Sequence, residues 1–441
     1  MVKLHSYQKD GLDWILRHKA SGLFFPPGLG KTLVTLSAIK ILIDHEEGID
    51  RILIIAPLRV LYMVWPLEIA KWGFDFSVGM LHGKDKDTTI RQKHDIYLIN
   101  PEGLKWLFTK HSRKFDMLVI DESTMFKNYS SARFKLMKEH VSQFKRKIIL
   151  TGTPAPNGLL QLWPQVFLLD FGKRLGKNIS TFRRRWFSKS FTGFGYDLTE
   201  GADMEIYSAI DDLVMHKSNS ELNMPDKLNN TILVRLPDNV MKQYREMLDE
   251  FIIELEHTDD ITATNAAAKC SKLKQVANGT VYGEDREIIV MHDEKLNATE
   301  ELVDSLAGRP LMIVYEHLHD LARLKERFKA PAIGGGIKED DLADIIQMWN
   351  AGQLPILLIQ PRVGGHGLNL QDGGCHDVLH YSIPYDLELY DQTNARVYRQ
   401  GVKNNVTIHH MVAERTIDTK IMAVLANKAN LQDELLDYLK K

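Results

Sequence analysis

The sequence predicts an α/β fold in which parallel β-sheets are flanked by helices. Two observations lead to this prediction: continuous apolar runs of strand length recur along the chain, and segments with helical periodicity lie between them. The length of 441 residues leaves room for two or three domains, each able to bury its own core.

Composition and charge set limits on location and partners. Hydrophobic residues make up 44% and charged residues 26%, the balance of a soluble globular protein. Cys270 and Cys375 are too few for a zinc ribbon or a disulfide framework, so we expect a reducing compartment. We find no signal-peptide core and no apolar run approaching ~18 residues, which predicts a cytoplasmic or nuclear protein without a membrane span. Because the net charge is only -2, nucleic-acid binding would need local basic patches.

Segment 4–16 predicts a first helix, with Leu12, Ile15 and Leu16 on one face and Gln8 just before it. A glutamine amide both donates and accepts, as reading an adenine edge requires. The alternative is a surface polar residue. The position of Gln8 shortly upstream of a Gly-rich turn favours the functional interpretation.

That turn, F-P-P-G-L-G-K-T at 25–32, lies between an apolar strand at 22–25 and a helical segment at 33–42. Strand, Gly-rich turn and helix form the layout of a nucleotide phosphate cradle. Lys31 would reach the β and γ oxygens and Thr32 would ligate Mg²⁺. The residues expected to bring their backbone to the phosphates are Gly28, Leu29 and Gly30.

Further buried strands are predicted at 51–57, 96–100 and 117–120. The third ends in Asp121 and Glu122, and unpaired carboxylates at a strand end are costly unless they meet a cation or water. We expect Asp121 to hold Mg²⁺ and Glu122 to orient and deprotonate the attacking water. An exposed Asp-Glu turn is the alternative.

The strand and turn at 147–163 contain T-G-T-P. Thr151 and Thr153 are placed to bond the acidic pair and to pass the nucleotide state onward, and Thr153 is also a candidate DNA contact. A Pro-Gly turn without such a role is an equal alternative.

Segment 171–196 is basic, with aromatic residues interleaved and no acidic residues. Its densest part is Arg183, Arg184 and Arg185, which we consider candidate contacts to the DNA backbone. A solvated charged face is the alternative.

A linker is predicted at 211–236, followed by a helix and a polar loop at 258–264. One face of that helix carries Met241, Tyr244, Leu248, Phe251 and Leu255.

A second α/β lobe is predicted from apolar strands at 311–315, 356–359, 378–381 and 406–411. Gly364 and Gly365 follow one of them, where backbone amides could meet DNA phosphate, although a plain Gly-rich turn would look the same.

The segment 390–401, if helical, would place Gln392, Arg396 and Arg399 on one face. Two arginines pointing the same way suit stabilisation of a γ-phosphate in the transition state, an effect worth roughly 10³ to 10⁵ in rate. Surface salt bridging is the alternative.

In order, these motifs resemble those of the SWI/SNF family of DNA translocases within superfamily 2 of the helicase-like ATPases. The resemblance covers nearly the whole chain and rests on an ordered set that is specific where each motif alone is not. The stretches are Y-Q-K-D-G at Tyr7, G-L-G-K-T at Gly28, K-N at Lys127, L-T-G-T-P-A-P-N at Leu150, H-K-S at His216, D-E-K-L at Asp293, G-G-H-G-L-N-L at Gly364 and R-V-Y-R-Q-G at Arg396.

The resemblance implies two RecA-like lobes that bind ATP between them and double-stranded DNA across both. Lobe 1 would span 1–230, with a helical protrusion at about 165–230. Lobe 2 would span 231–441, with a protrusion at about 237–291 and a helicase C-terminal-type core at about 292–441.

The same resemblance implies ATP and Mg²⁺ as cofactors. It places Gln8 at the adenine and brings the catalytic residues Gln392, Arg396 and Arg399 from the lobe opposite Lys31. Three stretches depart from the family pattern. Phe25 replaces a small residue, D-E-S-T replaces D-E-A-H or D-E-G-H, and Gln360-Pro361-Arg362 replaces a Ser-Thr-Arg-type stretch.

We therefore predict a DNA-stimulated ATPase, a monomer, that steps along double-stranded DNA without necessarily separating its strands. Single-stranded DNA and RNA remain alternative partners. A strand-separating DNA or RNA helicase is one alternative function. A nucleotide-gated DNA-binding scaffold without turnover is another, but it would not need Lys31, Glu122 and both arginines.

Overall fold

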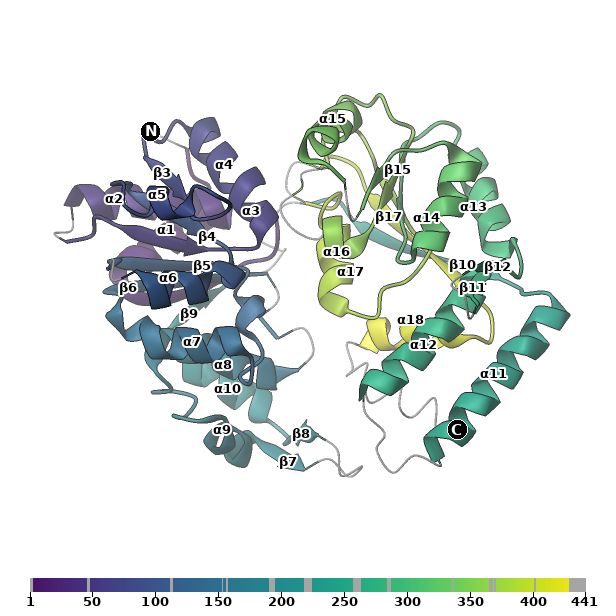
Figure 1. The fold of residues 1–441 in the computed structure, drawn as a ribbon, viewed down its shortest axis with the longest axis horizontal. Coiled ribbons are helices and arrows are strands. Elements are labelled where there is room, and N and C mark those ends of the chain that lie inside the picture. Colours follow the sequence, from purple (N-terminus) through teal and green to yellow (C-terminus); the bar gives the residue numbers. More distant parts are fainter. Residues whose placement is uncertain are drawn as a thin grey trace. The chain divides into compact units, whose positions relative to one another are not determined.

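The chain divides into two compact units, Met1–Asn223 and Met224–Lys441, in the computed structural model (Figure 1). The structure describes residues 3–45, 48–111, 114–152, 154–155, 158–189, 195–217, 224–256, 263–283, 287–334, 337–364, 368, 370–399 and 402–427. Each unit contains one large sheet in which every strand pairing is parallel. The predicted α/β class is thereby confirmed.

The sheet of the first unit has seven strands in the order β3-β4-β2-β5-β6-β1-β9. Its central strands are buried on both faces, which is why they read as continuous apolar runs. The strands are β1 Ala20–Phe24, β2 Ile52–Ile55, β3 Val78–Met80, β4 Ile96–Ile99, β5 Met117–Asp121, β6 Arg146–Thr151 and β9 Val214–His216.

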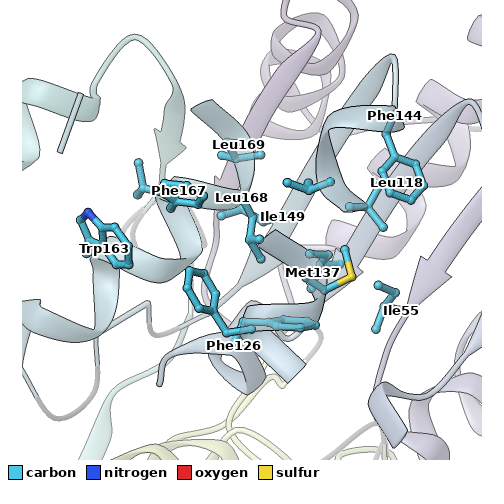
Figure 2. Packing of buried hydrophobic residues seen from close by; sticks show 14 of the residues in the cluster. Ile55, Leu118, Phe126, Met137, Phe144, Ile149, Trp163, Phe167, Leu168 and Leu169 are labelled. Carbon is cyan, nitrogen blue, oxygen red and sulfur yellow. The ribbon is translucent and has the colours of Figure 1, made fainter. Parts of the chain in front are cut away.

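Helices flank this sheet, and a small antiparallel hairpin, β7 Phe187–Lys189 with β8 Tyr196–Leu198, follows α9. Figure 2 shows part of the core, where Phe126, Met137 and Phe167 belong to one buried cluster with residues of the sheet. The helices are α1 Ser6–Arg17, α2 Lys31–His45, α3 Leu58–Met63, α4 Trp65–Trp72, α5 Lys86–Thr89, α6 Leu104–Lys110, α7 Ala132–His140, α8 Leu162–Asp170, α9 Ile179–Trp186 and α10 Ala202–Ile210.

The sheet of the second unit has six strands in the order β10-β17-β16-β13-β15-β14. The strands are β10 Lys227–Val234, β13 Leu311–Val314, β14 Ala332–Ile333, β15 Ile356–Ile359, β16 Asp377–His380 and β17 Val406–Ala413. A hairpin joins β11 Thr280–Tyr282 to β12 Ile288–Val290. The helices are α11 Asp238–Glu256, α12 Ala263–Asn278, α13 Glu294–Ser305, α14 Leu318–Phe328, α15 Glu339–Asn350, α16 Pro361–Gly364, α17 Leu387–Asn394 and α18 Ile417–Asn427.

The boundary between the two units falls within 211–236, where the linker was predicted, but this segment also holds a strand of each sheet. β9 pairs with β1 in the first unit, and β10 pairs with β17 over eight residues in the second. β10 lies at the edge of its sheet and is exposed along most of its length, so its sequence lacks the apolar run of a central strand. The lobe boundary expected after residue 230 falls within β10.

The amphipathic helix predicted before residue 256 is confirmed as α11. Tyr244 is fully buried, and Met241, Leu248 and Phe251 pack against the same apolar cluster. The polar loop predicted at 258–264 lies mostly outside the described residues, and α12 begins at Ala263. In the part of the chain that the structure describes, no helix is both long and apolar enough to cross a membrane.

A fully buried ion pair joins two helices of the second unit. Lys295 of α13 and Asp418 of α18 lie 2.6 Å apart, and both side chains have 0% exposure. The Lys295 ammonium also donates to Asn278 Oδ1 at 2.8 Å, while Asp418 accepts the Ala413 N–H at 3.0 Å. Paired in this way, neither charge is left without compensation.

We expect Asp418→Ala to lower the free energy of unfolding by about 3–5 kcal/mol, because Lys295 would remain buried without its counter-ion. Chemical denaturation measures this loss. The double variant Lys295→Met/Asp418→Leu should recover most of it, since apolar groups of similar volume leave no charge behind. Glu246→Ala, which breaks the exposed pair with Lys242, should cost at most about 0.5 kcal/mol.

Candidate active site

The Gly-rich turn follows β1 and runs directly into α2, as predicted. Gly28 and Gly30 have φ angles of 92° and 75°, in the left-handed region that favours glycine. A Cβ at Gly30 would also lie 2.4 Å from Gln8 Nε2. The backbone conformation and the lack of room for a Cβ therefore both require glycine at position 30. Leu29, between the two glycines, is fully buried.

Lys31 begins α2, and its ammonium folds back over the turn. It donates to the backbone carbonyl of Phe25 at 2.7 Å and to that of Pro26 at 3.4 Å. A lysine amine held inside a turn of exposed N–H groups is well placed for phosphate oxygens. Thr32, the next residue, lies half-buried in the first turn of α2.

Phe25 occupies the position where a small residue was expected, and packing accounts for it. Its φ is not positive, so the backbone does not need glycine there. The side chain is fully buried, and a Cβ added at Gly11 of α1 would lie 3.1 Å from the Phe25 ring. Phe25 therefore packs the turn closely against α1.

Gln8 lies within α1, not before it as predicted, and Tyr7 and Gln8 share the buried face with Gly11 and Ile15. Its amide donates to the Leu29 carbonyl at 3.3 Å and accepts the His5 N–H at 3.0 Å. These two bonds fix Gln8 against the Gly-rich turn. A predicted binding residue is thus brought to the turn by side-chain contacts within the first unit.

The far end of α1 is held by an arginine that the sequence did not single out. Arg146 of β6 is buried and donates to the carbonyls of Ile15, Leu16 and His18 at 3.1 to 3.2 Å. These carbonyls belong to the last turn of α1 and to the residue after it, where a cation is favourable.

Asp121 ends β5 and is buried, with both carboxylate oxygens bonded. Trp65 Nε1–H donates to Oδ2 at 3.0 Å, and the Glu122 N–H donates to Oδ1 at 3.1 Å. Burial, followed by the charge of Glu122, raises the pKa of Asp121 to about 7, against the opposing effects of Lys31 and Trp65. The effect of Lys31 shows that the phosphate turn and the acidic pair act on each other electrostatically. Trp65 was missed because a lone tryptophan in an apolar helix carries no motif.

Glu122 has left-handed backbone angles, φ 57° and ψ 63°, although it is not glycine. Such a residue costs about 1–3 kcal/mol and persists only where its surroundings hold it. Strain of this kind concentrates at functional sites. The conformation therefore supports a functional role for Glu122, which lies half-exposed beside the buried Asp121.

Thr32 in the first turn of α2 and Asp121 at the end of β5 have the oxygen ligands that Mg²⁺ prefers. Among the described residues, no group of three His, Cys, Asp or Glu side chains could hold a metal without further ligands. Mg²⁺ is usually bound by one or two carboxylates together with substrate phosphates and water. One carboxylate and one hydroxyl match that mode.

The T-G-T-P turn lies beside the Gly-rich turn. Thr151 ends β6 and is fully buried, and a Cβ at Gly152 would lie 2.8 Å from Pro27 Cδ. Thr153 falls outside the described residues.

In the second unit, Gln392 lies buried in α17 and donates to Glu388 at 3.1 Å. The condition for placing Gln392, Arg396 and Arg399 on one helical face is not met, because α17 ends at Asn394. The Arg396 N–H donates to the Thr393 carbonyl, three residues back, so the chain leaves the helix in a tighter turn. The Asn394 side chain is hydrogen-bonded to His380. Arg396 is buried and donates to the Leu368 carbonyl at 3.2 Å, while Arg399 is half-buried.

The candidate DNA contacts have different surroundings. Arg183 lies over the rings of Tyr129 and Tyr196, at 5.0 and 4.5 Å, and donates to the Tyr129 hydroxyl. Arg184 and Arg185 are exposed. Gly364 ends the short helix α16, and Gly365 lies outside the described residues.

Two family models match the chain. A model described as the SNF2-related domain matches residues 7–286, and one described as the helicase conserved C-terminal domain matches residues 294–401. The first alone covers more than half of the chain.

Similar proteins from other organisms extend this match. Protein p41 of Acyrthosiphon pisum secondary endosymbiont phage 1 is 32% identical, across 99% of this chain and 98% of its own length. A protein of Mycoplasma pneumoniae, named as an uncharacterized ATP-dependent helicase, is 25% identical across 99% of this chain. The alignment spans only 42% of that relative.

Among solved structures, the SWI2/SNF2 ATPase core of Sulfolobus solfataricus in complex with double-stranded DNA is 23% identical, with a TM-score of 0.48. This likeness covers 97% of this chain and 91% of the other. The description of the fold rests on the strand order of the two sheets and not on this likeness.

We expect metal-dependent nucleotide binding to weaken as the pH falls through about 7, because a proton on Asp121 competes with the cation. Trp65→Phe removes a hydrogen bond that favours the carboxylate, so the pKa of Asp121 should rise and the inflection should move to higher pH. Titration of Mg·ADP binding at a series of pH values measures this.

Trp72→Phe is the matched control on the same helix, since Trp72 bonds Glu68 instead. Its inflection should stay at the wild-type pH. An inflection that does not move in Trp65→Phe would contradict the assignment of Asp121 to the metal.

Proposed function

The chain belongs to the SNF2-related family of helicase-like ATPases, and on this premise we propose that it hydrolyses ATP on double-stranded DNA and steps along the duplex. The observation that carries the proposal is the pairing of the phosphate turn with the acidic strand end. Lys31 acts on the pKa of Asp121, and Glu122 beside it is held in a strained conformation. A protein that only bound nucleotide would not need a second carboxylate beside Asp121 in that place.

The residues of the first unit have defined roles in this proposal. Gln8 reads the adenine, and the backbone of Gly28, Leu29 and Gly30 holds the phosphates together with the Lys31 amine. Asp121 and Thr32 hold Mg²⁺, which supplies charge neutralisation at the phosphates when bound. Glu122 orients the attacking water and accepts its proton.

The second unit supplies positive charge at the γ-phosphate in this proposal. Arg396 and Arg399 stabilise the charge that develops during transfer, and Gln392 supports them from α17. Alternation between a state with these arginines engaged and one without them would move the backbone contacts of one unit along DNA relative to the other.

We expect Glu122→Gln to retain Mg·ATP binding and to lower the turnover number by at least about 10²-fold, because the proton acceptor is removed. Arg396→Ala should lower turnover by about 10³-fold or more while DNA affinity is largely kept. Steady-state ATP hydrolysis and equilibrium binding measure both effects. Glu139→Gln and Arg245→Ala, which remove exposed charges outside the site, serve as controls. Turnover in Glu122→Gln equal to that of wild type would refute the role of Glu122.

The nucleic acid is tested by measuring ATP turnover with duplex DNA, single-stranded DNA and RNA side by side. Duplex DNA should stimulate most. A translocase should also displace the third strand of a triplex without unwinding a fluorescent duplex. Unwinding of the duplex would favour a strand-separating helicase, and stimulation by RNA alone would overturn the proposed substrate.

We expect Arg184→Gln and Arg185→Gln each to flatten the salt dependence of DNA binding, by up to ~0.9 in slope for each phosphate that is no longer neutralised. Arg183→Gln should instead lower stability, because its guanidinium packs between two tyrosine rings. Binding measured at several salt concentrations, together with thermal denaturation, separates the two effects. An unchanged salt slope in the double variant Arg184→Gln/Arg185→Gln would mean that this basic face is only solvated.

A further inference from the structure

A buried series of hydrogen bonds begins at the residue after Glu122. Ser123 Oγ donates to Gln165 Oε1 at 2.6 Å, and both side chains have 0% exposure. Gln165 Nε2 donates in turn to the Pro154 carbonyl at 2.5 Å and to the Gln161 carbonyl at 2.9 Å. One side chain of α8 thus connects the loop after β5 with the T-G-T-P turn after β6.

These bonds use every hydrogen of the amide. Both N–H groups of Gln165 go to backbone carbonyls, so its oxygen must be the acceptor and the Ser123 hydroxyl must be the donor. An apolar side chain of equal size would leave two carbonyls and one hydroxyl without this partner. The residue therefore does more than fill space in the core.

The Ser123–Gln165 bond lies next to Glu122, whose strained backbone conformation has to be stabilised by its surroundings. Glu122 keeps its left-handed conformation between two anchored neighbours, Asp121 and Ser123. Asp121 is bonded to Trp65 and to the Glu122 N–H, whereas the side chain of Ser123 is bonded to Gln165. Without the Gln165 bond, only the short 3-10 turn that follows, with its Met125 N–H bonded to the Glu122 carbonyl, holds that side, and Glu122 can relax toward an ordinary conformation.

We propose that Gln165 is a positioning residue that holds the Glu122 carboxylate in place through Ser123. It also binds the T-G-T-P turn, whose Gly152 packs on Pro27 of the phosphate turn. The position of the attacking water is therefore set together with that of the phosphates. The inference deepens the proposed ATP hydrolysis and rests on it for its kinetic test.

The test is Gln165→Met, which keeps the volume and removes the amide. Turnover with duplex DNA should fall about 10- to 100-fold, while the KM for ATP stays within about twofold, because the groups that bind phosphate are not touched. Ser123→Ala removes only the Ser123–Gln165 bond, so it should lower turnover in the same direction by a smaller factor. The double variant should be no worse than Gln165→Met alone, since Gln165→Met already lacks that bond.

A second readout does not depend on activity. Hydrogen exchange of the peptide 117–127, which contains the Met125 N–H bonded to the Glu122 carbonyl, should speed up about tenfold or more in both variants. Trp163→Phe is the control on the same helix, since it removes a bond to Gly176 and leaves Ser123 alone. It should change neither turnover nor exchange in that peptide.

The possible outcomes distinguish a failure of the role proposed for Gln165 from a failure of the proposed ATP hydrolysis. Unchanged exchange in 117–127, or full turnover in Gln165→Met, would overturn the role of Gln165. A wild-type protein without ATP turnover would overturn the proposed function, and the exchange measurement would still decide whether Gln165 holds Glu122.

Discussion

The first unit depends on one constraint, which is that parallel strands end at the same edge of a sheet. β5, β6 and β1 are neighbours in the sheet, and each is followed by a turn that holds candidate site residues. The acidic pair follows β5, the T-G-T-P turn follows β6, and the Gly-rich turn follows β1. Segments far apart in the sequence are thereby brought together, and the charge of Lys31 lowers the pKa of Asp121 against the larger rise that burial causes.

The same edge explains why this site needs so much support from outside the motifs. A buried carboxylate and a strained glutamate are each unfavourable by themselves. Trp65 compensates the first, and the Gln165 amide, in our proposal, the second. Phe25 packs α1 against the turn that contains the glycines. Two of these supporting residues, Trp65 and Gln165, come from α4 and α8, where no local pattern marks them.

Prediction from sequence succeeded where a strand was buried on both faces and failed where it was not. β2, β4 and β5 read as apolar runs, whereas the exposed edge strand β10 looked like a linker. The Gly-rich turn between β1 and α2 was predicted correctly because Gly28, Gly30 and Lys31 are residue types whose spacing marks such a turn. Trp65, Arg146 and Gln165 could not be found, because their roles exist only through partners distant in the sequence.

In the second unit, the key arginine already makes a hydrogen bond to the protein's own backbone. Arg396 is buried and bonds the Leu368 carbonyl within its own unit. A guanidinium has five N–H donors, and a phosphate would offer Arg396 a charged acceptor, which forms a stronger, charge-assisted bond than the Leu368 carbonyl does. In the proposed function, this stronger bond forms only when a phosphate is within reach of the arginine.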